Sequence, residues 1–199
     1  ALQAKVRPDE KIGALVRELK LVDDPAVRPL ASEREAKLKR LRDYVARNIR
    51  SAGPGLNQLP WSCFSSPETT LASGYGNSAD RAILLAAILK AAGIESRFVA
   101  VTPFGYAPAT LKLLSRYPAN WFSEVLVYVP VYETYLNDTS EYAKVGAARS
   151  EEQIGLNLSD GRLQVIRPRR KSESSVSLSY AIDLRANGSA EIQVRRQVT

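Results

Sequence analysis

The sequence predicts an α+β fold in which a buried central helix packs on an antiparallel β-sheet, followed by a C-terminal β-hairpin extension. A segment that is apolar except for Lys90, 82–92, ends at Gly93 and predicts the buried helix. Alternating apolar residues in 125–131, with a short partner strand at 134–137, predict one hairpin. Strict alternation in 176–184, followed by an Asn–Gly turn, predicts a second hairpin.

Two amphipathic helices are predicted before the central helix. The first helix is predicted over 9–20, because four apolar residues in this range have helical spacing: Ile12, Leu15, Val16 and Leu19. Ser32 and Glu35 have the spacing of a capping box for a second helix that runs to residue 50. Glycines and prolines between 53 and 60 indicate a long loop, and Ser66–Pro67 starts a short helix.

The central helix is predicted from near Ser78 to Gly93, with a strand over 94–101 after it. Residues 140–160 are weakly patterned. We therefore divide the chain into an N-terminal helical segment (1–30), a core (31–150), and a linker with a C-terminal β extension (151–199). The extension is interpreted as the start of a second β domain.

The amino-acid composition excludes several kinds of structure and site. The chain has 199 residues, of which 45% are hydrophobic and 25% charged, as is typical of a globular protein. No apolar run approaches the ~20 residues of a membrane helix, and no signal peptide is recognisable. The chain contains one cysteine, Cys63, and no histidine, which excludes an intrachain disulfide and a cysteine-based zinc site. We expect no metal and no cofactor.

The net charge of +7 is compatible with an acidic partner or with plain solubility. Basic residues gather in the helix over 33–50 and in the run 167–171. A solvated helix face and a solvated linker explain both groups, because charge runs usually face water. Aromatic residues are not interleaved with these clusters as they are in single-strand binders, so nucleic acid is not the expected partner.

Residues 76–80 read Gly-Asn-Ser-Ala-Asp and are followed by the buried helix. This segment resembles the Gly-Asp-Cys-x-Asp turn of bacterial transglutaminase-like proteins, which share the papain-like cysteine protease fold. Further segments resemble the family in the right order, and they are 42–50, 67–71, 121–129 and 135–139. The resemblance covers about residues 30–146, and taken together the set is specific. It implies a transglutaminase-like core, and the last hairpin resembles the β domain that often follows.

The resemblance places the family's Cys-His-Asp triad at Ser78, Glu124 and Asn137, so all three residues are replaced. Asp138 is one residue away and could substitute for Asn137. A thiolate at a helix N-terminus is stabilised by the helix dipole and a neighbouring imidazolium, whereas a serine must lose its proton to a base. These three losses predict a catalytically inactive member, a pseudoenzyme.

Two other interpretations remain open. Ser78, Glu124 and Asp138 could form a serine-carboxylate hydrolase or acyltransferase, if burial makes Glu124 a better base. Alternatively, the domain could bind nucleic acid, as the DNA-damage recognition proteins that resemble inactive transglutaminases do. In the purely structural interpretation, Ser78 is the N-cap of its helix, and Glu124 is a partly buried carboxylate paired with Arg81 or Arg97.

The expected remaining function is recognition of a protein or peptide by the old substrate cleft. Its walls are predicted to be the 102–120 loop and the binding residues Trp61, Tyr75, Asn77, Trp121 and Ser123. By resemblance alone, we expect a periplasmic, secreted or envelope setting and an upstream β domain in the same polypeptide. A cytoplasmic setting stays open. Cys63 is interpreted as an incidental cysteine, because no base accompanies it.

Overall fold

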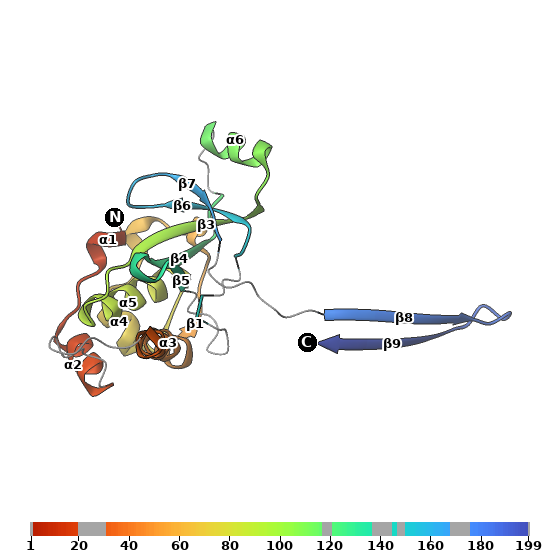
Figure 1. Cartoon of the computed structure of the whole chain (residues 1–199), viewed down its shortest axis with the longest axis horizontal. Coiled ribbons are helices and arrows are strands. Elements are labelled where there is room, and N and C mark those ends of the chain that lie inside the picture. The colour runs from red at the N-terminus through yellow and green to blue at the C-terminus, as the bar shows by residue number, and fades with distance from the viewer. Residues whose placement is uncertain are drawn as a thin grey trace.

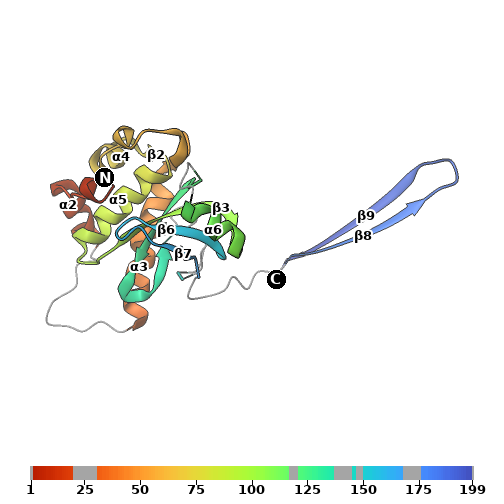
Figure 2. The same cartoon turned by 90° about the horizontal axis from the view of Figure 1, so that it is seen from above.

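A computed structural model describes residues 2–19, 31–116, 121–136, 145–146, 150–167 and 176–198 (Figures 1 and 2). Its helices are α1 (Leu2–Lys5), α2 (Glu10–Glu18), α3 (Ala31–Asn48), α4 (Pro67–Ser73), α5 (Ser78–Ala91) and α6 (Pro108–Arg116), with 3-10 turns at Leu56–Gln58, Trp61–Cys63 and Pro130–Tyr132. Its strands are β1 (Arg50–Ser51), β2 (Tyr75–Gly76), β3 (Arg97–Gly105), β4 (Glu124–Val129), β5 (Thr134–Leu136), β6 (Gln153–Asn157), β7 (Leu163–Val165), β8 (Val176–Leu184) and β9 (Ala190–Val198).

The central sheet has five strands in the order β5-β4-β3-β6-β7, and every neighbouring pair is antiparallel. The α+β class with an antiparallel sheet is therefore confirmed. The hairpin predicted over 125–137 is β4–β5, joined by the 3-10 turn at Pro130–Tyr132. Strands β6 and β7 were not predicted, and they extend the core sheet to Val165, beyond the boundary placed at residue 150.

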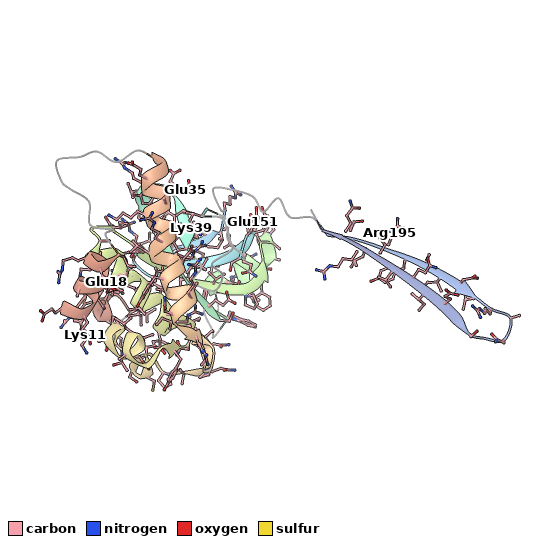
Figure 3. All side chains as sticks on the ribbon, turned by 90° about the horizontal axis from the view of Figure 1, so that it is seen from below. Lys11, Glu18, Glu35, Lys39, Glu151 and Arg195 are labelled. Atoms are coloured by element: carbon pink, nitrogen blue, oxygen red, sulfur yellow. The ribbon has the colours of Figure 1, made fainter. Side chains whose placement is uncertain are left out.

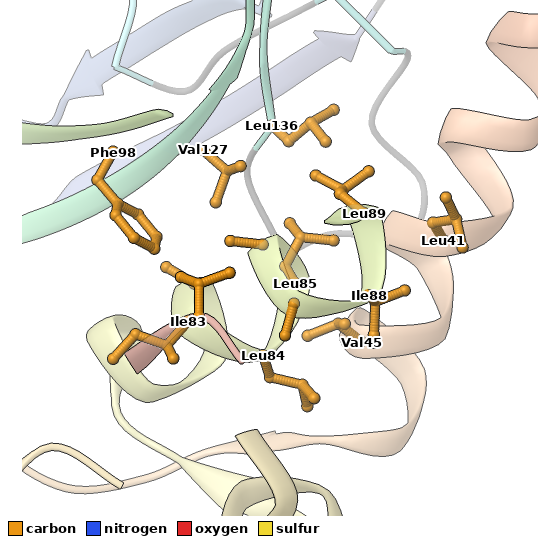
Figure 4. Packing of buried hydrophobic residues seen from close by; sticks show 14 of the residues in the cluster. Leu41, Val45, Ile83, Leu84, Leu85, Ile88, Leu89, Phe98, Val127 and Leu136 are labelled. Atoms are coloured by element: carbon orange, nitrogen blue, oxygen red, sulfur yellow. The ribbon is translucent and has the colours of Figure 1, made fainter. Parts of the chain in front are cut away.

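Helix α5 lies inside the molecule, as its apolar sequence predicts. All of its residues from Ala79 to Leu89 are buried. Figure 4 shows its leucines and isoleucines between Val45 of α3 and the inner face of the sheet, where Phe98 and Val127 lie. The helix ends one residue before Ala92, and Gly93 follows with φ +76°, a conformation that favours glycine. This helix thus positions everything at its N-terminus.

The two earlier helices were predicted well in extent and less well in detail. The predicted helix over 9–20 is α2, which is capped by the side chain of Asp9. Helix α3 begins at Ala31, so Ser32 is inside the helix and not its N-cap. Figure 3 shows Lys39 and Glu35 projecting from α3.

The solvated-face interpretation of α3 is wrong for two of its basic residues. Arg42 is buried with its Nε donating to Asp43 Oδ1 at 2.8 Å, and buried Lys37 donates to the carbonyl of Ala92 at 3.2 Å. These side chains satisfy their charges and donors inside the fold. The basic surface of the helix is correspondingly smaller than the sequence suggests.

Strands β8 and β9 form the second predicted hairpin and pair only with each other among the described strands. Figure 1 shows the hairpin standing apart from the five-stranded sheet. Apolar side chains on one face are exposed, and they are Leu178, Tyr180, Ile182, Leu184, Ile192 and Val194. No helix in the described part of the chain is long and apolar enough to span a membrane.

Deleting residues 168–199 is expected to leave the melting temperature of the core unchanged within about 2 °C, which is under about 1 kcal/mol for a chain of this size. The reason is that the described side chains of β8 and β9 are exposed along both strands and support only the hairpin. Differential scanning calorimetry of the full and shortened chains measures this. A larger fall would mean that the hairpin packs on the core in solution.

Candidate functional site

The candidate site is the N-terminus of α5, where the resemblance predicts the nucleophile position. The Asn77 side chain caps the helix, because its Oδ1 accepts from the backbone N–H groups of Ala79 and Asp80, both at 2.9 Å. Asp80 Oδ2 in turn accepts from Asn77 N at 3.2 Å and completes a capping box. The interpretation of Ser78 as the N-cap is therefore wrong: Asn77 is the cap, and Ser78 is the first helical residue.

The hydroxyl of Ser78 is not accessible to solvent. Its Oγ is buried and has no hydrogen-bond partner among the described residues. A catalytic serine needs a base within hydrogen-bond reach of this oxygen. The Ser78–Glu124 contact that a serine-carboxylate enzyme requires is not formed.

The segment from Arg50 to Leu56 covers this helix end. Arg50 N and Ala52 N donate to the carbonyls of Gly74 and Gly76 at 2.8 and 2.9 Å, so β1 runs parallel to β2 directly before α5. The segment then crosses to the start of β4, where Leu56 N donates to the carbonyl of Ser123 at 3.3 Å. A short connection of backbone hydrogen bonds thus links the two sides of the site.

Asp80 has a structural role that its place in the motif does not reveal. The side chain is buried, and its Oδ1 accepts from Ser65 N at 2.7 Å while Oδ2 accepts from Asn77 N. A Cβ at Gly76 would lie 2.9 Å from Asp80 Cβ and 3.1 Å from Thr70 Cγ2, so only glycine fits where α4 and α5 meet. The motif residues on either side of Ser78 hold the turn in place.

Glu124 begins β4 and is exposed to solvent, so the interpretation of a partly buried, arginine-paired carboxylate is wrong. Arg97 pairs with Glu95 at 3.2 Å, and Arg81 is buried within α5. Glu124 and Ser123 line a polar cavity of about 140 Å³, together with Val101, Thr102, Pro103, Ser150 and Gln153. The side chains in this cavity offer a carboxylate, three hydroxyls and an amide.

The predicted binding residues occupy different surroundings. Tyr75 is 59% exposed beside the helix start, and Trp121 is 36% exposed with its ring edge-to-face on Phe104 at a centroid distance of 5.4 Å. Asn77 is buried and used by the cap, whereas Ser123 N donates to the carbonyl of Val101 at 3.0 Å. The roles of these residues in binding stay predictions.

Other predicted positions can be placed only in part. Asn137 and Asp138 lie outside the described residues, as does the side chain of Trp61. Cys63 is exposed. The prediction that 102–120 forms a loop is wrong, because this range contains the end of β3 and the helix α6. The apolar residues Ala107, Leu111 and Leu114 have helical spacing and could have indicated this helix.

Two tyrosines that lie away from the start of α5 have raised pKa values. Burial, with a smaller contribution from Tyr128, raises the pKa of the Tyr135 phenol on β5. Burial, with a contribution from Glu18, raises the pKa of Tyr44 on α3. Within the described residues, no group of three or more acidic, cysteine or histidine side chains is placed to hold a metal ion. The site therefore offers hydrogen-bonding and aromatic groups for binding.

Replacing Ser78 by alanine is expected to raise the free energy of unfolding by about 0.5–1 kcal/mol, because a buried hydroxyl without a partner costs stability. Urea unfolding measures the change. Ser66→Ala is the matched control, since Ser66 Oγ accepts from Thr69 N at 3.2 Å as the cap of α4, and its loss should cost about 1 kcal/mol. If Ser78→Ala lowered the free energy of unfolding by as much as Ser66→Ala, the Ser78 hydroxyl would have to make a hydrogen bond, which would contradict this prediction.

The comparisons with known proteins agree with this architecture. The family profile described as Transglutaminase-like superfamily matches residues 24–144, which is more than half of the chain. A candidate protease from Parabacteroides distasonis has a similar crystal structure, with a TM-score of 0.51 and 20% identity over 83% of this chain. A candidate cysteine protease from Cytophaga hutchinsonii gives a TM-score of 0.43 and 12% identity over 100% of this chain.

This chain spans 30% of the Parabacteroides protein and 55% of the Cytophaga protein. None of the curated proteins compared with the chain matches it. At 20% identity the Parabacteroides structure shows the fold alone, whereas the family profile includes the turn at 76–80, the helix α5 and the start of β4. The chain belongs to the transglutaminase-like superfamily.

Proposed function

We propose that this chain is a transglutaminase-like domain without acyl-transfer or protease chemistry, whose cleft recognises a protein or peptide segment. The observation that carries the proposal is the state of Ser78: at the nucleophile position the hydroxyl is buried and has no hydrogen-bond partner among the described residues. The chain has no histidine to act as its base. Members of the superfamily usually use a cysteine nucleophile, and the structural neighbours are named as protease candidates.

Glu124 does not supply the missing base. It is exposed, and Ser78 Oγ makes no hydrogen bond to it. General base catalysis needs that contact, directly or through one water, and the buried Ser78 Oγ is not accessible to a substrate carbonyl.

Recognition is supported by what surrounds the closed helix end. Exposed aromatic side chains lie at Tyr75, Phe104 and Trp121, and a polar cavity opens at Ser123 and Glu124. Aromatic residues are common anchors at protein interfaces because they bury a large area with few rotatable bonds. The envelope setting and an upstream β domain belong to the same proposal and follow from the family resemblance.

An activity assay from about pH 4 to 8, the range in which a carboxylate base would titrate, tests the proposal. The readouts are peptide hydrolysis and amine incorporation into a glutamine-rich protein, with Ser78→Ala measured in parallel and an active cysteine protease as positive control. We expect no turnover by either protein. Turnover that disappears in Ser78→Ala would contradict the proposal and make Glu124→Gln the next variant.

A further inference from the structure

A second cavity lies between α6 and the strands β6 and β7. Its volume is about 780 Å³, within the range of small-ligand sites. The lining is mostly apolar and consists of Tyr106, Pro108, Leu111, Lys112, Leu114, Ser115, Phe122, Leu156, Gly161 and Leu163. Figure 1 shows α6 separated from the other helices, beyond the end of β3.

The cavity exists because α6 is held to the core at few points. Pro108, Leu111, Lys112 and Ser115 have the spacing i, i+3, i+4 and i+7, so one face of the helix lines the cavity. Leu114 is the one buried residue of α6, with 3% of its surface exposed. The inner face of this helix is therefore only partly covered by the protein.

The opposite wall is apolar and belongs to the edge of the sheet. Leu156 of β6 and Leu163 of β7 are directly opposed in the strand register, and Phe122 lies before β4. Strand β7 is the last strand of the sheet, so no described strand pairs with its outer edge. An extended peptide can bind such an edge through its backbone while a side chain enters a neighbouring pocket.

One of the residues that line this cavity carries a charge. Lys112 is the charged residue among those that line it, and it makes no ion pair with the described residues. The neighbouring carboxylate of Asp160 is engaged by its own turn, since it accepts from Arg162 N at 2.9 Å and from Asn157 Nδ2 at 3.4 Å. A ligand with an apolar body and one carboxylate would complement both features.

We propose that the cavity binds the C-terminal residue of a peptide, with its apolar side chain between Leu111 and Leu163 and its carboxylate on Lys112. The peptide backbone would lie beside the outer edge of β7. This inference rests on the proposed function, because it names the part of the partner that is recognised and where it binds. It assigns no chemistry to Ser78 or Glu124.

Chemical-shift mapping of the full 199-residue chain with dipeptide and fatty-acid probes tests the assignment. The probes are N-acetyl-Leu-Phe with a free carboxylate and the same dipeptide as its amide. We expect shifts at residues 106–115 and 156–163, and binding of the acid about fivefold tighter than the amide, as one partly exposed ion pair provides. Decanoate is the third probe, because a fatty acid shares the apolar and anionic groups without a peptide backbone.

Two pairs of variants locate the contacts. Lys112→Gln should remove the preference for the acid, whereas Lys11→Gln, which changes an exposed lysine on α2, should keep it. Leu111→Trp should obstruct the space between Leu111 and Leu163, where the apolar side chain is proposed to bind, and weaken binding of both dipeptides. Leu113→Trp places the same indole at a neighbouring residue of α6 that is 48% exposed and does not line the cavity, so binding should remain.

The outcomes separate the two proposals. Shifts around Tyr75 and Glu124 without shifts at 106–115 would overturn this inference and leave peptide recognition standing. Equal binding of acid and amide would overturn the role of Lys112, and binding of decanoate alone would overturn the peptide assignment. Absence of any binding by both dipeptides would count against this inference, and the proposed function would then be judged by the activity assay.

Discussion

Replacing Asp80 by alanine is expected to lower the free energy of unfolding by about 3 kcal/mol, although the residue belongs to a motif associated with catalysis. Its carboxylate is 6% exposed and accepts two backbone N–H groups, from Ser65 at 2.7 Å and from Asn77 at 3.2 Å. Alanine would leave both donors without their acceptor inside the protein. It would also remove a negative charge from the first turn of α5, where the helix dipole favours one.

Urea unfolding followed by circular dichroism measures this change, with two comparison variants. Asp80→Asn keeps one acceptor oxygen and should lose about half as much stability. Asp160→Ala is the surface control, since Asp160 is exposed and caps only the turn between β6 and β7, and it should cost less than about 1 kcal/mol. If Asp80→Ala were as mild as Asp160→Ala, Asp80 would not hold the turn before α5.

Replacing Gly155 by alanine is expected to cost about 2 kcal/mol through overpacking. A Cβ at this position of β6 would lie 2.6 Å from Ile166 Cδ1 and 2.6 Å from Val99 Cγ1. Both neighbours are fully buried, so neither can move into free space. The absence of a side chain at Gly155 lets Ile166 lie against the sheet and close the second, smaller apolar cluster.

Thermal and urea unfolding of Gly155→Ala measure the cost. Gly105→Ala is the matched control on β3, because no atom lies within 4 Å of the position its Cβ would take, and its stability should be unchanged or slightly higher. The double variant Gly155→Ala with Ile166→Val removes the clashing Cδ1 and should recover part of the loss. Equal stability of the Gly155 and Gly105 variants would contradict the packing described for β6.

Long periodic segments were predictable because burial decides them. The apolar run of α5 leaves no polar face, and the 176–194 alternation around Asn187–Gly188 has only one good pairing. Strands β6 and β7 escaped prediction for a physical reason. β6 is short and carries Gly155 at its centre, a residue that weakens an isolated strand and here makes room for Ile166.

Details of single side chains could not be predicted. Asn77 and Ser78 are equally good N-caps, and the choice between them depends on a one-residue shift of the helix start. The burial of Lys37 depends on the carbonyl of Ala92, which is far away in the sequence. Charged residues are interpreted as solvated until such a partner is known.

The location of the candidate site could be predicted from the sequence, whereas its side-chain details could not. The resemblance placed the central helix near Ser78, where α5 begins, and a strand within 121–129, where β4 lies. It did not reveal that the segment 50–56 links the two elements or that Ser78 Oγ is enclosed. The link comes from backbone hydrogen bonds between distant segments, which leave no pattern in the sequence.

The measurement that tests the central claim most directly is covalent labelling by a fluorophosphonate, followed by mass spectrometry of the intact protein and its peptides. This reagent phosphonylates serine hydroxyls that are exposed and activated by a base. We predict no adduct on Ser78, and no reagent-dependent increase in mass for either the wild type or Ser78→Ala. A stoichiometric adduct on Ser78 that is absent from Ser78→Ala would show an activated nucleophile and contradict the account of an inactive recognition domain.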